Sequence, residues 1–476
     1  MPLHNMFYRM FKASVPAIIL LVLTLIVFLA VAPVNAETDT HKFVAVGNGD
    51  DFIVALRDDG TVWTWGRIAG EIFPDKSTYT DRSTPLQVNI DNVTAISVGG
   101  AHCLMLKTDG SVWSWGFNDD GQLGDGTNTG TNRADIRPVQ VSGLDNIISI
   151  SSGGSNSLAL KDDGSVWSWG GNWNGQLGDG TFEDREVPVR LTGLNNVSAI
   201  FSGSFAVKDD GTVWTWGRTL LNPDNEGYVT DDQKVLHAMY RPDPYPIPGL
   251  RNITCIDTDF SQRHVIFTKD DGTVWCWGYD SLGQLGYGTN IISNPKYLDS
   301  PVRVKGLADI KEVSAGTESS MALKSDGTVW VWGHNGGGQL GTGKPGEIYT
   351  LPVKLSGPQD VVSITSKSMN SAFLTRDGSV WVCGHAYAGQ KGDGTIDRYN
   401  FIETPIKVLG PGNYNPVNIT ITSQDNDTVV SQLSNTTSSV NPEYDFPDGL
   451  ISMAIIVISL LFLIMVAIAY IKQIKN

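Results

Sequence analysis

Short runs of alternating apolar and polar residues fill the chain from residue 41 to residue 409, and turn residues separate them. In one stretch, residues 95–98 and 103–106 are followed by Asp109-Gly110 and then by the Val-Trp-Ser-Trp run at 112–115. Alternation with a period of two predicts half-buried β-strands. Asp-Gly between two such runs is a strong hairpin signal, because the turn needs residues that tolerate a positive φ. The pattern therefore predicts antiparallel strand pairs.

The phrase that contains this hairpin recurs seven times. The glycines of its Asp-Gly step are Gly60, Gly110, Gly164, Gly211, Gly272, Gly327 and Gly378, at intervals of 50, 54, 47, 61, 55 and 51 residues. In Trp-x-Trp the two indoles share one face of the strand, and the intervening residue, such as Thr64 or Ser114, lies on the other. Sheets with large rings on one face and small groups on the other suit stacking against copies of themselves. A repeat of this length therefore predicts the blades of a β-propeller.

A further short apolar run follows a proline in most units. These runs are residues 85–88, 138–141, 188–191, 301–304, 352–355 and 405–408. The first unit begins at Phe43 with no such run before it, and no Trp strand follows 405–408. We therefore expect 405–408 to complete one blade with residues 43–66, which would close the ring and remove exposed edges. The predicted fold is all-β, a seven-bladed β-propeller of four-stranded blades over residues 37–409.

A glycine loop follows the Trp strand in five units. Its copies are Gly121–Gly124, Gly175–Gly178, Gly283–Gly286, Gly338–Gly341 and, as Gly-Gln-Lys-Gly, Gly389–Gly392. The other copies read Gly-Gln-Leu-Gly, and none has the Lys-Ser/Thr that a phosphate-binding loop needs. We interpret the loop as a buried turn in which the glutamine satisfies main-chain groups.

Three elements of this repeat together resemble the regulator of chromosome condensation (RCC1-type) repeat family. They are Gly99–Leu106, the Asp-Gly-x-Val-Trp-x-Trp-Gly phrase, and the Asn-x-x-Gly-Gln-Leu-Gly-x-Gly run at 118–126. The resemblance covers about 370 residues and implies a seven-bladed propeller. The founding member of that family is a nuclear exchange factor for a small GTPase that binds chromatin, and a secreted bacterial relative inhibits β-lactamases. Neither role transfers residue by residue to this chain.

Hydrophobic segments at both ends predict export and anchoring. The run Val15–Val34 follows Arg9 and Lys12 and ends in small residues, so residues 1–36 read as a signal peptide or, alternatively, as an uncleaved anchor. Residues 450–471 read as a transmembrane helix, since Leu450–Tyr470 carries no charge. Residues 410–449, rich in Asn, Thr, Ser and Pro, read as a flexible spacer. The basic tail 472–476 predicts a cytoplasmic C-terminus, with the propeller outside the cell membrane.

Charge and cysteine use narrow the classes of partner and of site. The net charge is −16, and −18 without the first 36 residues, which hold two basic and no acidic residues. Such an acidic chain repels phosphate backbones, so nucleic acid is excluded as a partner. The four cysteines, at 103, 255, 276 and 383, lack metal spacing and read as core fillers or, alternatively, as a bridge. Six sequons are candidate glycosylation sites: Asn92, Asn196, Asn252, Asn418, Asn426 and Asn435.

The expected function is that of a surface-exposed scaffold that binds a protein or a glycan. Long loops on a rigid ring usually carry binding function, and the fourth unit has a long connection from Arg218 to Tyr245. The candidate binding residues there are Tyr228, His237, Tyr240, Arg241 and Tyr245, of types favoured in interfaces, although such a loop can also simply pack on its own ring. The alternatives are a structural component of a cell-surface layer and an exchange-factor-like regulator. No catalytic constellation, cofactor site or metal site is expected, because the histidines are scattered over repeat positions.

Overall fold

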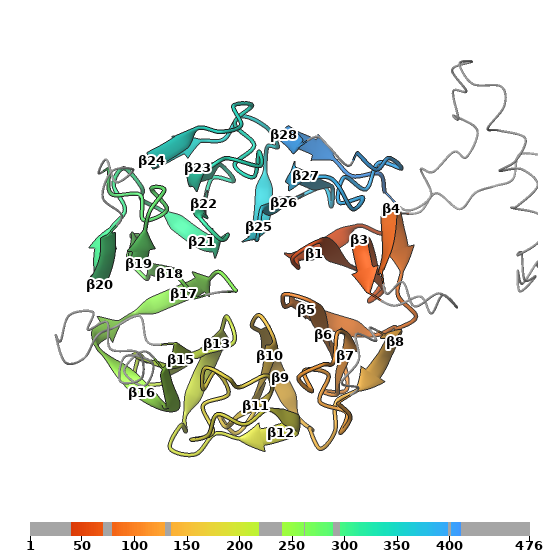
Figure 1. Ribbon diagram of the computed structural model, residues 1–476, viewed down its shortest axis with the longest axis vertical. Coiled ribbons are helices and arrows are strands. Elements are labelled where there is room, and N and C mark those ends of the chain that lie inside the picture. The colour runs from red at the N-terminus through yellow and green to blue at the C-terminus, as the bar shows by residue number, and fades with distance from the viewer. Residues whose placement is uncertain are drawn as a thin grey trace, which may run out of the picture. The chain divides into compact units, whose positions relative to one another are not determined.

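The computed structural model describes residues 40–69, 79–128, 135–218, 240–260, 262–288, 296–397 and 401–410. They form seven four-stranded sheets arranged as blades around an axis (Figure 1). The prediction of an all-β, seven-bladed propeller with four-stranded blades is confirmed. The predicted signal peptide, most of the spacer and the C-terminal hydrophobic segment lie outside the described residues. Among the described residues, no helix is long and apolar enough to span a bilayer.

Each blade is built from four consecutive strands. Blade 1 contains β1 Phe43–Asn48, β2 Phe52–Arg57, β3 Val62–Ala69 and β4 Tyr79–Gln87; blade 2 contains β5 Val93–Val98, β6 His102–Lys107, β7 Val112–Gly116 and β8 Asp135–Gln140. Blade 3 contains β9 Ile147–Ser152, β10 Asn156–Lys161, β11 Val166–Gly170 and β12 Arg185–Arg190; blade 4 contains β13 Val197–Phe201, β14 Phe205–Lys208, β15 Thr212–Arg218 and β16 Tyr240–Arg251.

The last three blades follow the same order. Blade 5 contains β17 Ile253–Thr258, β18 His264–Lys269, β19 Val274–Asp280 and β20 Lys296–Arg303; blade 6 contains β21 Ile310–Ala315, β22 Ser319–Lys324, β23 Val329–His334 and β24 Ile348–Lys354. Blade 7 contains β25 Val361–Lys367, β26 Asn370–Thr375, β27 Val380–His385 and β28 Phe401–Lys407.

The ring closes without any strand exchanged between its two ends. β28 pairs with β27 of blade 7. Blade 1 takes its outer strand from residues 79–87. The prediction that residues 405–408 complete a blade with residues 43–66 is therefore wrong. In each unit that has a proline run, the run lies in the fourth strand, which follows the Trp strand of the same unit. The first unit therefore already has four strands, and 405–408 completes the seventh.

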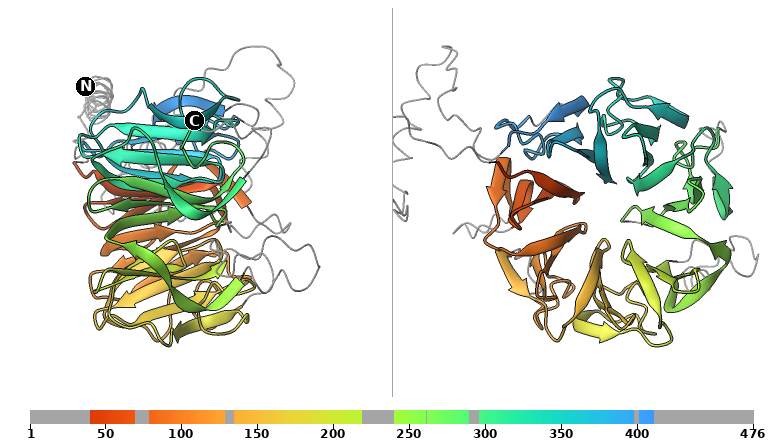
Figure 2. Two further views of the ribbon diagram at one scale, coloured as in Figure 1. Left: turned by 90° about the vertical axis from the view of Figure 1, so that its left-hand side faces the viewer. Right: turned by 180° about the vertical axis from the view of Figure 1, so that it is seen from behind.

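The two ends of the ring differ in what they carry. The first strand of each blade lies nearest the axis and contacts the first strands of its neighbours (Figure 1). At one end, the pocket face, the first strand turns into the second and the third connects to the fourth; residues 49–51 and 171–184 are examples. At the opposite end, the hairpin face, lie the Asp-Gly turns and the links between blades, such as residues 58–61 and 88–92. Figure 2 shows the stacked sheets from the side.

The Asp-Gly turns form the predicted hairpins, but the positive φ expected at both turn residues is found at the glycine alone. Gly60 has a φ of 80°, a value that glycine adopts without steric cost. The Asp59 carboxylate accepts hydrogen bonds from the main-chain N–H and the hydroxyl of Thr61 at 3.0 and 2.6 Å. The Thr61 hydroxyl in turn accepts a hydrogen bond from Nε1 of Trp63 at 3.1 Å. In blades 1, 2, 4 and 5 the threonine or serine after Asp-Gly thus ties the turn to the first indole of the Trp strand.

The second tryptophan of the phrase fills the core between two blades. Trp169 of blade 3 is fully buried and packs in one cluster with Leu104, Val112 and Val141 of blade 2. The small residue on the other face of the blade 2 strand, Ser114, is also fully buried. The predicted stacking of ring-bearing faces on small-residue faces is confirmed.

The Gly-Gln-Leu-Gly loop secures this core from the pocket face. Oε1 of Gln122 accepts the main-chain N–H of Asp120 at 2.9 Å, which confirms that the glutamine satisfies main-chain groups. The main-chain carbonyl of Gln122 accepts Nε1 of Trp169, in the next blade, at 2.9 Å. The same bond joins Trp216 to Gln176, Trp332 to Gln284 and Trp65 to Gln390. In the described part of the chain, Nε1 of Trp115 and Trp277 has no partner, and each follows a blade that lacks the loop.

The seam between blade 7 and blade 1 uses these same contacts. Trp65 donates to the Gln390 carbonyl at 3.1 Å. One hydrophobic cluster runs through blades 6, 7 and 1 and includes Phe43, Phe373 and Val408. Side-chain packing and hydrogen bonds thus close the ring, in place of the predicted exchanged strand.

The four cysteines support the packing rather than a bridge. All four are free. Cys103, Cys276 and Cys383 are buried, and Cys255 is half-buried. Of the two alternatives left by the sequence, core filling is confirmed. Cys383 takes the place of the second tryptophan in blade 7 and contacts the carbonyl of Gln339 at 3.4 Å.

Candidate binding pocket at the ring axis

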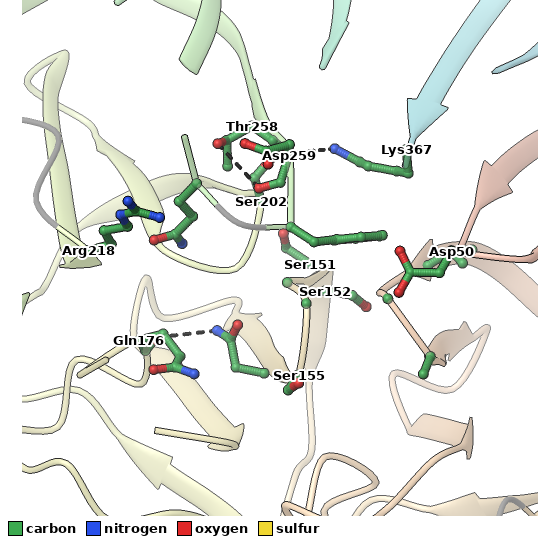
Figure 3. Close-up of a pocket in the computed structure, with 18 of the residues that line it drawn as sticks. Asp50, Ser151, Ser152, Ser155, Gln176, Ser202, Arg218, Thr258, Asp259 and Lys367 are labelled. Atoms are coloured by element: carbon green, nitrogen blue, oxygen red, sulfur yellow. Dashed lines mark hydrogen bonds between the residues drawn. The ribbon is translucent and has the colours of Figure 1, made fainter. Parts of the chain in front are cut away.

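A cavity of about 600 Å³ opens on the axis at the pocket face, and we call it the axial pocket (Figure 3). Residues from blades 1 to 5 line it, together with Lys367 of blade 7. Its volume lies within the range of about 300–1,000 Å³ that is typical of small-molecule sites. Hydroxyl and amide side chains are prominent in its wall, among them Ser97, Ser151, Ser155 and Asn156. The wall is therefore suited to a polar ligand rather than to an apolar one.

The turn between β17 and β18 narrows the axis. It has five residues, 259–263, where three residues separate β5 from β6 and β9 from β10. Gln262 adopts a φ of 49°, and its amide donates to Oγ of Ser204 in blade 4 at 2.7 Å. Phe260 reaches blade 3, where a Cβ on Gly154 would lie 3.3 Å from its carbonyl oxygen. The long turn is thereby fixed against two other blades.

An ion-paired network fixes one wall of the axial pocket. Nζ of Lys367 donates to Oδ1 of Asp257 at 2.7 Å, and to the carbonyls of Thr258 and Ala315 at 2.7 and 3.4 Å. The same Asp257 oxygen accepts the hydroxyl of Ser202 at 2.7 Å, and Oδ2 accepts the main-chain N–H of Ala315 at 2.9 Å. An ammonium group has three protons to donate. All three of these protons have acceptors inside the protein, so Lys367 joins blades 5, 6 and 7 and is not available to hold an anion.

Asp50 brings a carboxylate to the opening. Figure 3 shows Asp50 and Arg218 on opposite sides, with Ser151 and Ser152 between them. The main-chain N–H of Asp50 donates to the carbonyl of Gly100 at 2.9 Å, which fixes its backbone against blade 2. The walls of the ring limit hydration of the carboxylate, and the charge of the adjacent Asp51 adds to this effect. Together they raise the pKa of Asp50 to about 6.

Trp173 forms an aromatic surface at the edge of the axial pocket. It lies outside the repeated phrase and is 55% exposed, whereas the second tryptophans of the phrase, such as Trp169, are buried. Its ring lies over Gly171, where a Cβ would come within 2.6 Å of ring carbon Cζ3. Blade 2 has Phe117 at the position that Gly171 occupies in blade 3. Glycine therefore provides the space that the exposed indole needs.

The candidate residues from the long connection lie elsewhere. Tyr228 and His237 are outside the described residues. Tyr240, Arg241 and Tyr245 lie on β16, the outer strand of blade 4, and none of them lines the axial pocket. The Arg241 guanidinium lies 4.6 Å from the centre of the Tyr245 ring. Burial raises the pKa of Tyr245 to about 12. Their role in binding stays a prediction.

Two histidines at the repeat position have structural partners. Nε2 of His102 lies 2.9 Å from Oγ of Ser157, which donates its only proton to the carbonyl of Gln122 at 3.1 Å. His102 must therefore be the donor to the serine, in its neutral form. His264 and Ser320 repeat this arrangement at 3.1 Å. Burial lowers the pKa of both histidines to about 4. Within the described residues, no group of three His, Cys, Asp or Glu side chains is placed to hold a metal ion.

The sequence reasoning missed the axial pocket because its residues come from turns about 50 positions apart. Two signals were present. Trp173 stands outside the repeated phrase. The turn between the first and second strands is two residues longer in blade 5, where it ends at His264, than in blade 2, where it ends at His102. Both departures from the repeat fall on the axial pocket. Departures in short turns were thus as informative as the long connections.

One family model matches more than half of the chain. A model described as an RCC1-like domain matches residues 29–308. Two models described as regulator of chromosome condensation (RCC1) repeats match residues 326–374 and 310–339. The matches together extend over the propeller except for residue 309 and the part of blade 7 after residue 374.

Curated relatives are similar at lower identity. The E3 ubiquitin-protein ligase HERC2 of Mus musculus is 27% identical over 77% of this chain, which corresponds to 6% of the ligase. The ultraviolet-B receptor UVR8 of Arabidopsis thaliana is 29% identical, with 75% of this chain and 80% of the receptor covered. The guanine nucleotide exchange factor SRM1 of Saccharomyces cerevisiae is 27% identical, with 50% of this chain and 56% of the factor covered.

Solved structures show the same fold. Prp20p from Saccharomyces cerevisiae, studied for its binding to Gsp1p and histones, superposes with a TM-score of 0.61 at 19% identity, covering 75% of this chain and 87% of its own. Human WBSCR16 gives a TM-score of 0.57 at 22% identity, covering 69% and 85%. At these identities the likeness concerns the fold.

Proposed function

Since this chain belongs to the family of RCC1-like repeat propellers, we propose that it is a protein-binding module held on the outer face of a membrane, with the pocket face as its contact surface. The observation that carries the proposal is the axial pocket, a concave polar site on a rigid ring. The connection between β15 and β16 starts and ends at the same face. Concave sites and variable loops on a fixed scaffold are where binding function concentrates.

The hydrophobic ends of the chain support the outer location. Leu450–Tyr470 has the length and the lack of charge of a bilayer-spanning helix, and Lys472 and Lys475 follow it. Arg9 and Lys12 precede the first hydrophobic run, Val15–Val34. Both ends support a location of residues 37–449 on the far side of the membrane from the cytoplasm.

The sequons of the ring support the choice of face. Asn92, Asn196 and Asn252 are exposed, and each has a positive φ in the link between two blades. These links lie on the hairpin face. Glycans carried there would cover the hairpin face and leave the pocket face clear for a partner.

Protease treatment of intact cells tests the location. An accessible propeller would be lost from the full-length protein on intact cells, and an antibody to the tail after Lys472 would detect a protected fragment. A propeller that survives until the cells are lysed would contradict the proposal. It would instead favour an exchange-factor-like role inside the cell, to which the 27% identity with the yeast exchange factor points.

Cross-linking on intact cells tests the contact face. In Ser155→Arg a bulky cation enters the axial pocket, whereas the matched variant Thr108→Arg places the same side chain on the hairpin face. We expect the proteins cross-linked to the wild type to be retained by Thr108→Arg and lost by Ser155→Arg. Loss in Thr108→Arg alone would assign contact to the other face, and recovery of the chain itself alone would favour a surface-layer component.

A further inference from the structure

The axial pocket combines features that suit one class of ligand. Its aromatic surface, Trp173, is exposed and lies over Gly171. Partly exposed hydroxyl and amide side chains line the same pocket, among them Ser155 and Asn174. A sugar ring has the complementary shape, since one face presents C–H groups that pack on an indole while its edge presents hydroxyls that donate and accept hydrogen bonds.

The charges of the axial pocket argue against two other classes of ligand. An anion such as a phosphate finds Lys367 already bound to Asp257 and to main-chain carbonyls, and it would meet the Asp50 carboxylate in the same lining as the two arginines. A cationic side chain from a partner would meet Arg218 and Arg263, which line the same opening. A neutral polyol avoids both problems, because it needs hydrogen bonds rather than a net charge.

Preorganisation favours such a ligand further. The Lys367–Asp257 ion pair lies at 2.7 Å with both side chains mostly buried, and it joins blades 5 and 7 across blade 6. The long blade 5 turn is fixed by the bond from Gln262 to Ser204. A wall that is rigid before binding loses little conformational entropy when a ligand enters.

We propose that the axial pocket binds one saccharide unit, with the Trp173 indole stacked on the C–H face of the sugar and the Asp50 carboxylate accepting from its hydroxyls. This inference deepens the proposed function and rests on it, because it identifies the part of the partner that the pocket face recognises as a glycan. The partner protein is then a glycoprotein, or the ligand is a cell-surface polysaccharide.

An oligosaccharide array tests the inference directly. The full-length chain, in a detergent without a sugar headgroup, is applied to oligosaccharides that end in glucose, galactose, mannose, N-acetylglucosamine or rhamnose. We expect binding to at least one terminal sugar, and we expect Trp173→Ala to weaken it by about tenfold or more through loss of the stacking surface. Trp173→Phe keeps an aromatic ring and should recover part of the binding.

A matched control separates the axial pocket from the rest of blade 3. Phe182 is 43% exposed on the same blade but does not line the pocket, so Phe182→Ala should bind as the wild type does. Absence of binding to every sugar would overturn the inference, and so would equal binding by Trp173→Ala. If the array fails while Ser155→Arg still loses cross-linked proteins on cells, the saccharide inference alone is wrong. If sugars bind but no protein is cross-linked, the proposal of a protein partner fails instead.

Discussion

The side-chain amide of Asn48 in blade 1 donates to the main-chain carbonyl of Asn370 in blade 7 at 3.2 Å. The exchange is reciprocal, because the amide of Asn370 donates to the carbonyl of Asp50 at 3.1 Å. Asn48 also donates to the carbonyl of Thr365 at 3.3 Å. Both asparagines are buried. No strand crosses this seam, so the two amides join the ends of the propeller close to the axial pocket.

We predict that Asn48→Ala lowers the free energy of unfolding by about 1–3 kcal/mol, because it removes two hydrogen bonds from a buried seam. Urea denaturation of the full-length chain, followed by tryptophan fluorescence, measures the change. The matched control is Asn89→Ala, which truncates an exposed asparagine. Equal midpoints for the two variants would show that the amide pair does not hold the seam.

Sequence reasoning gave the blades but not the closure. Repeats of Asp-Gly and Trp-x-Trp determine strand order within a unit, because each rests on local turn geometry and on packing that every unit repeats. Closure depends on which unit each terminal run joins. A periodic sequence has no internal mark for that boundary, and Asn48 and Asn370 are 322 positions apart. Proximity of that kind follows only from the assembled ring.

The Trp–Gln bond between blades predicts the outcome of a pair of glycine substitutions. Gly124 and Gly143 are both in blade 2 with φ of 68° and 70°, so alanine at either position bears the same backbone strain, roughly 1–2 kcal/mol. A Cβ on Gly124 would lie 2.6 Å from Nε1 of Trp169, whereas a Cβ on Gly143 meets nothing within 4 Å. We expect Gly124→Ala to destabilise the fold by about 1–3 kcal/mol more than Gly143→Ala does. Chemical denaturation measures the difference, and equal losses would contradict the packing role of the indole.

The buried histidines predict that the propeller loses stability in mild acid. Burial lowers the pKa of His102 and His264 from 6.5 to about 4, so between these two pH values the unfolded chain binds protons that the folded chain does not. Stability is then fully present above pH 6.5 and falls as the pH drops towards 4, by roughly 3 kcal/mol per histidine. Asp50, with its raised pKa, acts in the opposite direction. Denaturation midpoints across this range measure the decline.

Asparagine already occupies the matching position in blade 3, as Asn156, so it is the natural replacement. The double variant His102→Asn/His264→Asn should lose most of the decline between pH 6.5 and pH 4. His41→Asn removes an exposed histidine and should keep the decline of the wild type. An unchanged slope in the double variant would assign the acid sensitivity to other groups.

The candidate site was harder to predict than the fold for a physical reason. The long connection drew attention because length is visible in a sequence, yet Tyr240, Arg241 and Tyr245 lie on the outer strand of blade 4. The axial pocket is instead made by short turns, whose convergence depends on the ring. Trp173 was visible as the exception to the repeated phrase, but sequence alone does not place its ring over Gly171 or at the edge of the axial pocket.

The cysteines should be unreactive in the folded protein. Burial raises the pKa of Cys255 to about 12 and raises the pKa of the other three as well. Because the thiolate is the reactive form, we expect no labelling by a thiol reagent in buffer. In urea without reductant, mass spectrometry should find four labelled thiols. Two labelled thiols would indicate a disulfide, and rapid labelling in buffer would show that the blades open.

The last prediction concerns the sequons of the hairpin face. The backbone conformation of their asparagines limits which substitutions can be used to remove them. Asn92, Asn196 and Asn252 have φ of 57°, 56° and 63°, a region that asparagine and aspartate tolerate better than most residues. Asn92→Asp therefore removes the sequon with little backbone strain. Asn92→Gln would remove the sequon and also strain the backbone, so its effects could not be separated. If the chain is glycosylated, mass spectrometry should find glycan at these positions, and the triple aspartate variant should lose it. Because the three sites lie away from the axial pocket, that variant should bind the same sugars as the wild type, and a loss of binding would place the ligand on the hairpin face.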